Sequence, residues 1–334
     1  MRPLEKRAVS ILAGSGVCLV ILGCVSLFLG RFVISPKEVA RILYLHAGGK
    51  TEASFAAQTV LNIRLPRTLL AIIVGAGLSV SGASFQGIFQ NRLVSPDILG
   101  VSNGAGFGAA LAMLLGLTPS GVTVFAFLGG ILSVALSYGM SRMKKEHNLL
   151  ALVLSGIVVA SFFSALISFL KLIADTESTL PSITYWLMGS FAGADYKKAA
   201  FAFFLVGIGM IVLFLMRWRI NLLSMGDEEA YTLGINPKKN RLIVIAACTL
   251  ITSACVTVTG IIGWIGMIMP NICRDYISAN NRWLLPAAGV VGGFFMLLVD
   301  ISARTLTAAE IPVGILTSVF GAPLFVMIYF KREG

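Results

Sequence analysis

The stretch that decides the fold runs from Arg64 to Ala110 and reads RLPRTLLAIIVGAGLSVSGASFQGIFQNRLVSPDILGVSNGAGFGAA. The 24 residues from Thr68 to Asn91 carry no charge. At a rise of 1.5 Å per residue, a helix of this length crosses a bilayer core of about 30 Å. The stretch therefore predicts a membrane span, followed by a polar turn at Asn91-Arg92.

Small residues repeat along this span and along the segment after the turn. They recur at every fourth position, first as Ala71, Gly75, Ser79, Ala83 and Gly87, then as Gly100, Gly104 and Gly108. Such ridges let another helix backbone approach closely in lipid. Ser95-Pro96 has the residue types of an N-cap and first helical position. We expect two closely packed membrane helices, and the glycines alone indicate packing rather than a binding site.

The composition places the whole chain in a membrane. Of its 334 residues, 57% are hydrophobic and 12% are charged, whereas a soluble domain has about 25% charged residues. The net charge of +11 does not indicate a nucleic-acid partner, because the basic residues lie at the ends of apolar segments instead of forming a stripe. We interpret the five cysteines as small core residues, since they lie in or beside apolar segments without a C-x-x-C motif.

The apolar segments predict about ten transmembrane helices in an all-α fold. They fall near 8–30, 66–90, 97–117, 120–141, 149–172, 199–216, 242–262, 264–279, 284–303 and 312–330. An even number of spans places both termini on one side. Most of the 26 Lys and Arg residues face the cytoplasm if both termini are cytoplasmic, and this distribution favours that orientation.

Two outer segments carry signals for short helices. In 31–65, Ser35-Pro36-Lys37-Glu38 has the pattern of a capping box with proline at the first helical position. In 173–198, Pro181 is expected to open a short helix over 182–188 at the pore mouth.

The longest inner segment, 217–241, reads RWRINLLSMGDEEAYTLGINPKKNR. Asp227 can cap a helix whose first turn carries Glu228 and Glu229, where carboxylates suit the helix dipole. Gly234 fits the helix stop, and Pro237 prevents continuation. The segment is either an ordinary cytoplasmic loop or a short helix that docks a soluble partner.

Chemical motifs are few. The chain has no G-x-x-x-x-G-K-[ST] loop, so we expect it to hydrolyse no ATP by a P-loop of its own. The only ionisable residues well inside the spans are Lys171, Asp300 and Arg304, all toward the proposed outer ends, and Asp300 can pair with Arg304 at i,i+4. Ion-coupled carriers usually hold such groups at mid-membrane, so a secondary carrier is the less favoured alternative.

A weak internal repeat links Ser79-Val80-Ser81-Gly82 to Thr257-Val258-Thr259-Gly260. Five spans separate the two stretches, so the halves would be inverted repeats of the kind that transporters use.

Several motifs together resemble the FecCD family, the permease subunits of type II ATP-binding-cassette importers. They are Arg64-Leu65-Pro66-Arg67, the glycine-rich stretch from Gly75 to Gly108 with Asn91 and Val101-Ser102-Asn103-Gly104, Gly226-Asp227-Glu228-Glu229-Ala230 with Leu233-Gly234, Gly260 to Pro270, and Asp300, Arg304, Glu310–Ile315 and Gly321-Ala322-Pro323. The resemblance covers nearly the whole chain. It departs at Pro270-Asn271, where the family often has Pro-His.

The resemblance implies a single permease domain over 1–334 with 217–241 as its cytoplasmic coupling segment. It implies two ATPase subunits that bind ATP and Mg²⁺, a second identical or homologous permease subunit, and an extracytoplasmic substrate-binding protein, all at a bacterial or archaeal inner membrane. By motif, Arg64, Arg67 and Arg304 would dock the binding protein from the outer surface, and Asn91 and Leu93 would form the cytoplasmic gate. The ATPases would couple through Gly226, Asp227, Glu228, Glu229, Ala230, Leu233 and Gly234.

The function that follows is import of a bulky metal chelate, with no cofactor in this chain. A caged metal needs no protein ligands in the pore, and the sequence shows no His, Cys, Asp or Glu cluster. Ferric siderophore is the favoured substrate, with haem, cobalamin and molybdate as the alternatives.

Overall fold

A computed structural model describes residues 3–30, 32–49, 54–143, 149–307 and 309–330. The described residues are helical, joined by turns and short connections. The helices are α1 (Pro3–Phe28), α2 (Pro36–Ala47), α3 (Phe55–Gln58), a π-helical turn (Thr59–Arg64), α4 (Leu65–Ile88), α5 (Val101–Leu114), α6 (Pro119–Ser141), α7 (Leu149–Ile173), α8 (Thr179–Leu187), α9 (Tyr196–Leu223), α10 (Asp227–Thr232), α11 (Pro237–Thr259), α12 (Ile265–Tyr276), α13 (Asn281–Thr305) and α14 (Val313–Phe330).

The prediction of about ten membrane helices is confirmed, because each predicted apolar segment contains one helix. Among the described residues, seven helical spans are long and apolar enough to cross a membrane. The apolar helices α5 and α14 are shorter, and α12 has 12 residues. The helix α9 is longer than expected, so residues 217–223 of the predicted coupling segment belong to a membrane helix and not to a loop.

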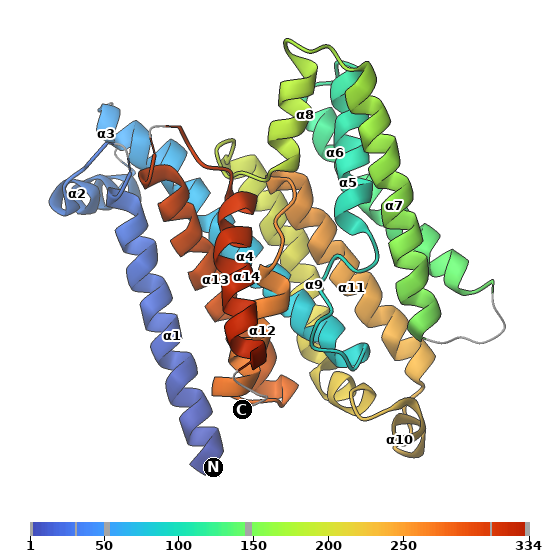
Figure 1. Cartoon of the computed structure of the whole chain (residues 1–334). Coiled ribbons are helices and arrows are strands. Elements are labelled where there is room, and N and C mark those ends of the chain that lie inside the picture. The colour runs from blue at the N-terminus through green and yellow to red at the C-terminus, as the bar shows by residue number, and fades with distance from the viewer. Residues whose placement is uncertain (1–2, 31, 50–53, 144–148, 308, 331–334) are drawn as a thin grey trace.

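Figure 1 shows the labelled termini and α10 at one end of the helix bundle, with α2, α3 and α8 at the opposite end. This places both ends of the chain on the same side, as the even number of spans requires. At the opposite end, Ser35 caps α2 by accepting a hydrogen bond from the Glu38 amide at 3.3 Å, as its sequence predicted.

The helix α4 lies at the centre of the bundle and packs against α13, α9, α11 and α12. Its ridge of small residues meets α13, where a Cβ on Gly75 would collide with the Gly292 carbonyl and one on Gly292 with Ser79. A Cβ on Gly82 would overlap the Gly266 carbonyl of α12. The predicted close approach is therefore made to α13 and α12, which lie about 200 residues further along the chain.

The second ridge, on α5, packs against α6. A Cβ on Gly104 would collide with the Gly129 carbonyl, and one on Gly108 with the Phe125 carbonyl. The helices α5, α6 and α7 form a second group, and α11 joins the two groups by packing against α4, α9, α5 and α6.

The predicted start of this helix at Ser95-Pro96 is wrong. Residues 92–100 form successive turns, and α5 begins at Val101 after Gly100, whose φ is +79°. The Asp97 side chain accepts a hydrogen bond from the Ser102 amide at 2.6 Å. The turns are packed between two other helices, with Pro96 against Gly266 of α12 and the Ile98 carbonyl against Gly156 of α7.

The cysteine prediction holds only in part. Cys248, Cys255 and Cys273 are buried, but Cys18 and Cys24 are exposed on α1. This helix lies at the edge of the bundle (Figure 1), and only 11% of its apolar span is buried.

Candidate functional site

The predicted coupling segment forms a short helix that projects from the same end as the termini (Figure 1). Glycines in left-handed or extended positive-φ conformations bound it, with φ values of +136° at Gly226 and +78° at Gly234. Ala230 is buried, and its carbonyl accepts a hydrogen bond from the Ile235 amide at 2.9 Å. Glu228 and Glu229 are exposed. The helix is thus fixed on its inner face and carries two acidic residues on its exposed side, with the Glu229 carboxylate next to Gly226.

Exposed apolar side chains accompany the carboxylates: Met225, Tyr231 and Leu233. Methionine and aromatic side chains are enriched at protein interfaces, so the exposed Met225 and Tyr231 suit a protein partner.

Asp227 does not cap this helix, as its sequence position had suggested. Gly226 holds the cap position, and the Asp227 carboxylate instead accepts two hydrogen bonds from Arg241 of α11, at 2.7 and 3.2 Å. A bidentate pair with a guanidinium outweighs one amide hydrogen bond, so the carboxylate turns toward α11. Through this pair α10 is tied to a membrane helix.

The predicted gate residues lie in the turn after α4. Asn91 accepts a hydrogen bond from the Leu93 amide at 2.9 Å, and the Leu93 side chain is 51% exposed. The turn is held by Asn271 of α12, which donates to the Arg92 carbonyl at 2.9 Å and to the Met267 carbonyl at 2.8 Å.

Asn271 belongs to a larger cluster of polar side chains. Arg274 donates to the side-chain Oδ1 of Asn271 at 3.1 Å and to the side-chain Oε1 of Gln86 at 3.0 Å, while Gln86 Nε2 donates to the Met267 carbonyl at 3.0 Å. Sequence reasoning missed these residues as a group. The available signal was that Gln86, Asn271 and Arg274 are polar residues inside or beside apolar segments, where lipid leaves them no partner.

The three arginines predicted to dock a binding protein lie together near the end of the bundle opposite α10. The Arg67 Nε donates to Asp300 Oδ1 at 2.8 Å, and its Nη1 donates to Glu310 at 3.0 Å. Arg304 lies 3.5 Å from Asp300, which confirms the predicted i,i+4 pair, and donates to the Ser26 carbonyl at 2.9 Å.

Their expected exposure on the outer surface is wrong. Arg64, Arg67 and Arg304 are only 4%, 5% and 5% exposed. Arg64 donates to the carbonyls of Leu27, at 2.9 Å, and Phe32. The physical reason is that the chain supplies its own acceptors: Asp300 and Glu310 for Arg67, and backbone carbonyls near the end of α1 for the other two. A docking role for these arginines stays a prediction.

A polar stripe that the sequence analysis missed lies on α7. Ser161, Ser164 and Ser168 are exposed along one face and line an open cavity of about 600 Å³ together with Asp97 and Asn103. The Asn103 amide donates to the Ala160 carbonyl at 3.0 Å. The hydroxyls of Ser161 and Ser168 donate to the carbonyls of Ile157, at 2.9 Å, and Ser164, at 3.0 Å, so their hydrogen bonds are satisfied within α7 and the stripe alone does not identify a binding site. The signal was the i, i+3, i+7 spacing of the serines.

Comparison with known proteins agrees with this architecture. The sequence profile of the FecCD transport family matches residues 18–331. The chain is 41% identical over 325 residues to the molybdate import system permease protein MolB of Haemophilus influenzae, covering 97% of this chain and 96% of that protein. It is 40% identical over 321 residues to a probable iron chelatin transport system permease of Helicobacter pylori, covering 94% and 96%. A solved structure titled an inward-facing conformation of a putative metal-chelate type ABC transporter has a TM-score of 0.88 at 40% identity, covering 96% of this chain and 99% of that one. The chain belongs to the FecCD transport family of ABC importer permeases.

Proposed function

We propose that this permease moves a ferric siderophore into the cytoplasm, driven by two ATPase subunits that dock on α10 and supplied by an extracytoplasmic binding protein. A second permease subunit, identical or homologous, would complete the pore. The relatives named for iron chelatin and metal-chelate transport support this substrate class.

The observation that carries the proposal is the construction of α10. It is a projecting helix with two exposed carboxylates, and the Asp227–Arg241 pair links it to α11. A docked subunit that moves α10 would act directly on a helix that packs against α4, α5, α6 and α9. This is the mechanical connection that an ATP-driven permease needs.

Uptake by proteoliposomes tests the proposal. The double variant Glu228→Lys/Glu229→Lys reverses the outward charge of α10, and we expect it to abolish ATP-dependent uptake while membrane insertion stays normal. Glu177→Lys is the matched control, because Glu177 is exposed near α8 at the opposite end. Unchanged uptake in the double variant, or uptake that follows a proton gradient and needs no ATPase, would contradict the proposal.

Orientation is tested separately by cysteine labelling in a background without native cysteines. Tyr44 on α2 and Lys239 on α11 are exposed at opposite ends of the bundle. We expect a membrane-impermeant reagent to label Tyr44→Cys from outside intact cells and Lys239→Cys only after permeabilisation.

Molybdate is the second candidate substrate, favoured by the 41% identity to MolB. Competition distinguishes the two. If ferric siderophore is the substrate, excess molybdate should leave uptake of the labelled siderophore unchanged. If molybdate is the substrate, the proteoliposomes should take up labelled molybdate.

A further inference from the structure

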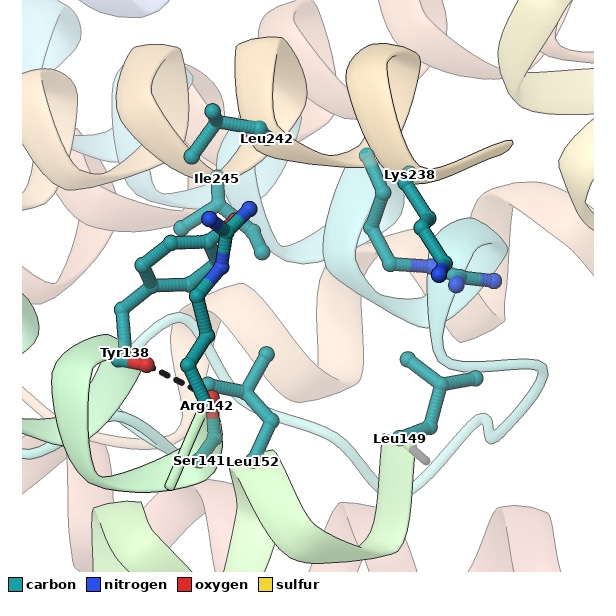
Figure 2. Close-up of a pocket in the computed structure, with 9 residues that line it drawn as sticks. Tyr138, Ser141, Arg142, Leu149, Leu152, Lys238, Leu242 and Ile245 are labelled. Carbon is teal, nitrogen blue, oxygen red and sulfur yellow. Dashed lines mark hydrogen bonds between the residues drawn. The ribbon is translucent and has the colours of Figure 1, made fainter. Parts of the chain in front are cut away.

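A small basic cavity lies between the end of α6 and the starts of α7 and α11, at the same end of the bundle as α10. Its volume is about 150 Å³. Figure 2 shows Arg142 and Lys238 on its rim, with Leu149, Leu152, Leu242 and Ile245 around it. Arg241 completes the lining. The cavity thus combines three cationic side chains with apolar walls.

Two of the three cationic side chains, those of Arg142 and Arg241, are held by contacts with other residues. The Arg142 guanidinium lies 4.8 Å from the centre of the Tyr138 ring and donates to the Tyr138 hydroxyl at 2.5 Å. Arg241 is buried and fixed by Asp227, and its Nε has no hydrogen-bond partner within the described part of the chain. A guanidinium held in this way binds oxyanions with little loss of conformational freedom.

The positive charge is only partly balanced. Asp227 neutralises Arg241, but neither Arg142 nor Lys238 forms an ion pair with any residue that the structure describes. An anion in the cavity would therefore meet these two cations together with Arg241, whose Nε has no hydrogen-bond partner among the described residues.

We propose that this cavity binds the phosphate headgroup of an anionic phospholipid from the cytoplasmic leaflet. The mixed lining carries the assignment: the basic groups suit a phosphate, and Leu149 and Leu242 offer apolar contact for the glycerol and first acyl carbons. Leu242 lines the cavity and is 40% exposed, so it is also accessible from outside the protein. The choice of leaflet rests on the proposed function, which places α10 in the cytoplasm.

The position of the cavity gives the bound lipid a consequence. Arg241 lines the cavity and also holds Asp227 of α10, so a bound anion would share this guanidinium with Asp227. The lipid would thereby lie next to the ion pair that connects α10 to α11.

Native mass spectrometry of the full-length chain in its membrane complex tests the site, with phosphatidylglycerol as the probe. We expect Lys238→Gln to lower phosphatidylglycerol retention about fivefold, the effect of one basic residue near an anionic leaflet, and Arg142→Gln/Lys238→Gln to lower it further. Lys239→Gln is the matched control, because it removes the same charge one residue away, where the side chain does not line the cavity. Equal losses in the Lys238 and Lys239 variants would overturn the site.

A second arm separates the lipid from a free anion. Thermal unfolding is measured in detergent with phosphatidylglycerol, phosphatidylcholine or inorganic phosphate. Protection by phosphatidylglycerol alone, lost in Lys238→Gln, supports the headgroup assignment, whereas equal protection by inorganic phosphate overturns it. Neither readout involves transport, so loss of the lipid site and failure of the uptake test are distinguishable.

Discussion

Arg67 on α4 and Asp300 on α13 form a buried ion pair, with 2.8 Å between Nε and Oδ1 and side-chain exposures of 6% and 0%. The two residues are 233 positions apart in the sequence. Arg304 and Glu310 extend the pair to a cluster in which each carboxylate contacts a guanidinium. These charges connect α4 and α13 at the end of the bundle opposite α10, and further along the same two helices the ridge of small residues brings their backbones close.

Removing either partner of this pair should strongly destabilise the protein. Arg67→Met leaves the Asp300 carboxylate buried beside Arg304 alone, and truncation of a buried pair typically costs about 3–5 kcal/mol. Thermal unfolding in detergent measures the loss. Arg92→Met is the control, because the Arg92–Asp275 pair is half-exposed at 3.7 Å and should contribute about 1 kcal/mol or less. Equal effects of the two variants would contradict a structural role for the buried pair.

Charge reversal at Arg64 should lower the folded yield rather than the affinity for a binding protein. The Arg64 guanidinium donates to the backbone carbonyls of Leu27 and Phe32. An ionised carboxylate at this position has no proton to donate, so both carbonyls and the carboxylate would be buried without hydrogen bonds. Membrane yield of Arg64→Glu, compared with Arg41→Glu on the exposed face of α2, measures the effect. A normal yield with reduced binding-protein affinity would instead restore the docking role.

Gly82→Ala should destabilise the crossing of α4 and α12. The added methyl group would overlap the Gly266 carbonyl, so the two backbones must separate, and overpacking of this kind costs about 1–3 kcal/mol. Gly23→Ala is the matched control on α1, where a Cβ meets no atom within 4 Å. The control should be neutral or slightly stabilising, because alanine has a higher helix propensity than glycine. Similar unfolding temperatures for the two variants would show that the helices adjust to the extra volume.

The sequence was sufficient for the number and order of the membrane helices, because length and hydropathy directly reflect the thickness of the bilayer. It also identified the ridges at Gly75 and Gly104, since small residues at every fourth position of a membrane helix allow another helix to pack closely. It could not identify the partner helices. The approach of Gly75 to Gly292 depends on tertiary packing, which the local pattern does not contain.

The candidate sites were predictable to a smaller extent for the same reason. Gly234 was found because a left-handed stop is a local backbone property. The burial of Arg67 was missed because its partners, Asp300 and Glu310, are more than 230 residues away. Asp227 was predicted to cap its own helix by accepting from a nearby backbone amide. Its carboxylate instead accepts two charge-assisted hydrogen bonds from Arg241, 14 residues further along the chain.

Asn271 should control the turn that carries the predicted gate. Asn271→Ala removes the donor to the Arg92 carbonyl and the acceptor for Arg274, and a buried polar group left unpaired costs about 1–3 kcal/mol. We expect the turn to open more often, which raises the labelling rate of a Leu93→Cys reporter in a background without native cysteines. A change of about 1.4 kcal/mol in the opening equilibrium corresponds to about a tenfold faster rate.

Two further variants make this test specific. Asn280→Ala removes another asparagine at the same end, one that bonds Asn221 and the Arg282 amide but not the turn, and it should leave the labelling rate unchanged. Asn271→His should fall between the alanine variant and the native chain. A neutral imidazole donates at one nitrogen and accepts at the other, so it can keep either the Arg92 or the Met267 hydrogen bond of Asn271 but not both. If all three variants label at the native rate, the turn is held by other contacts, and Asn271 is a packing residue of α12.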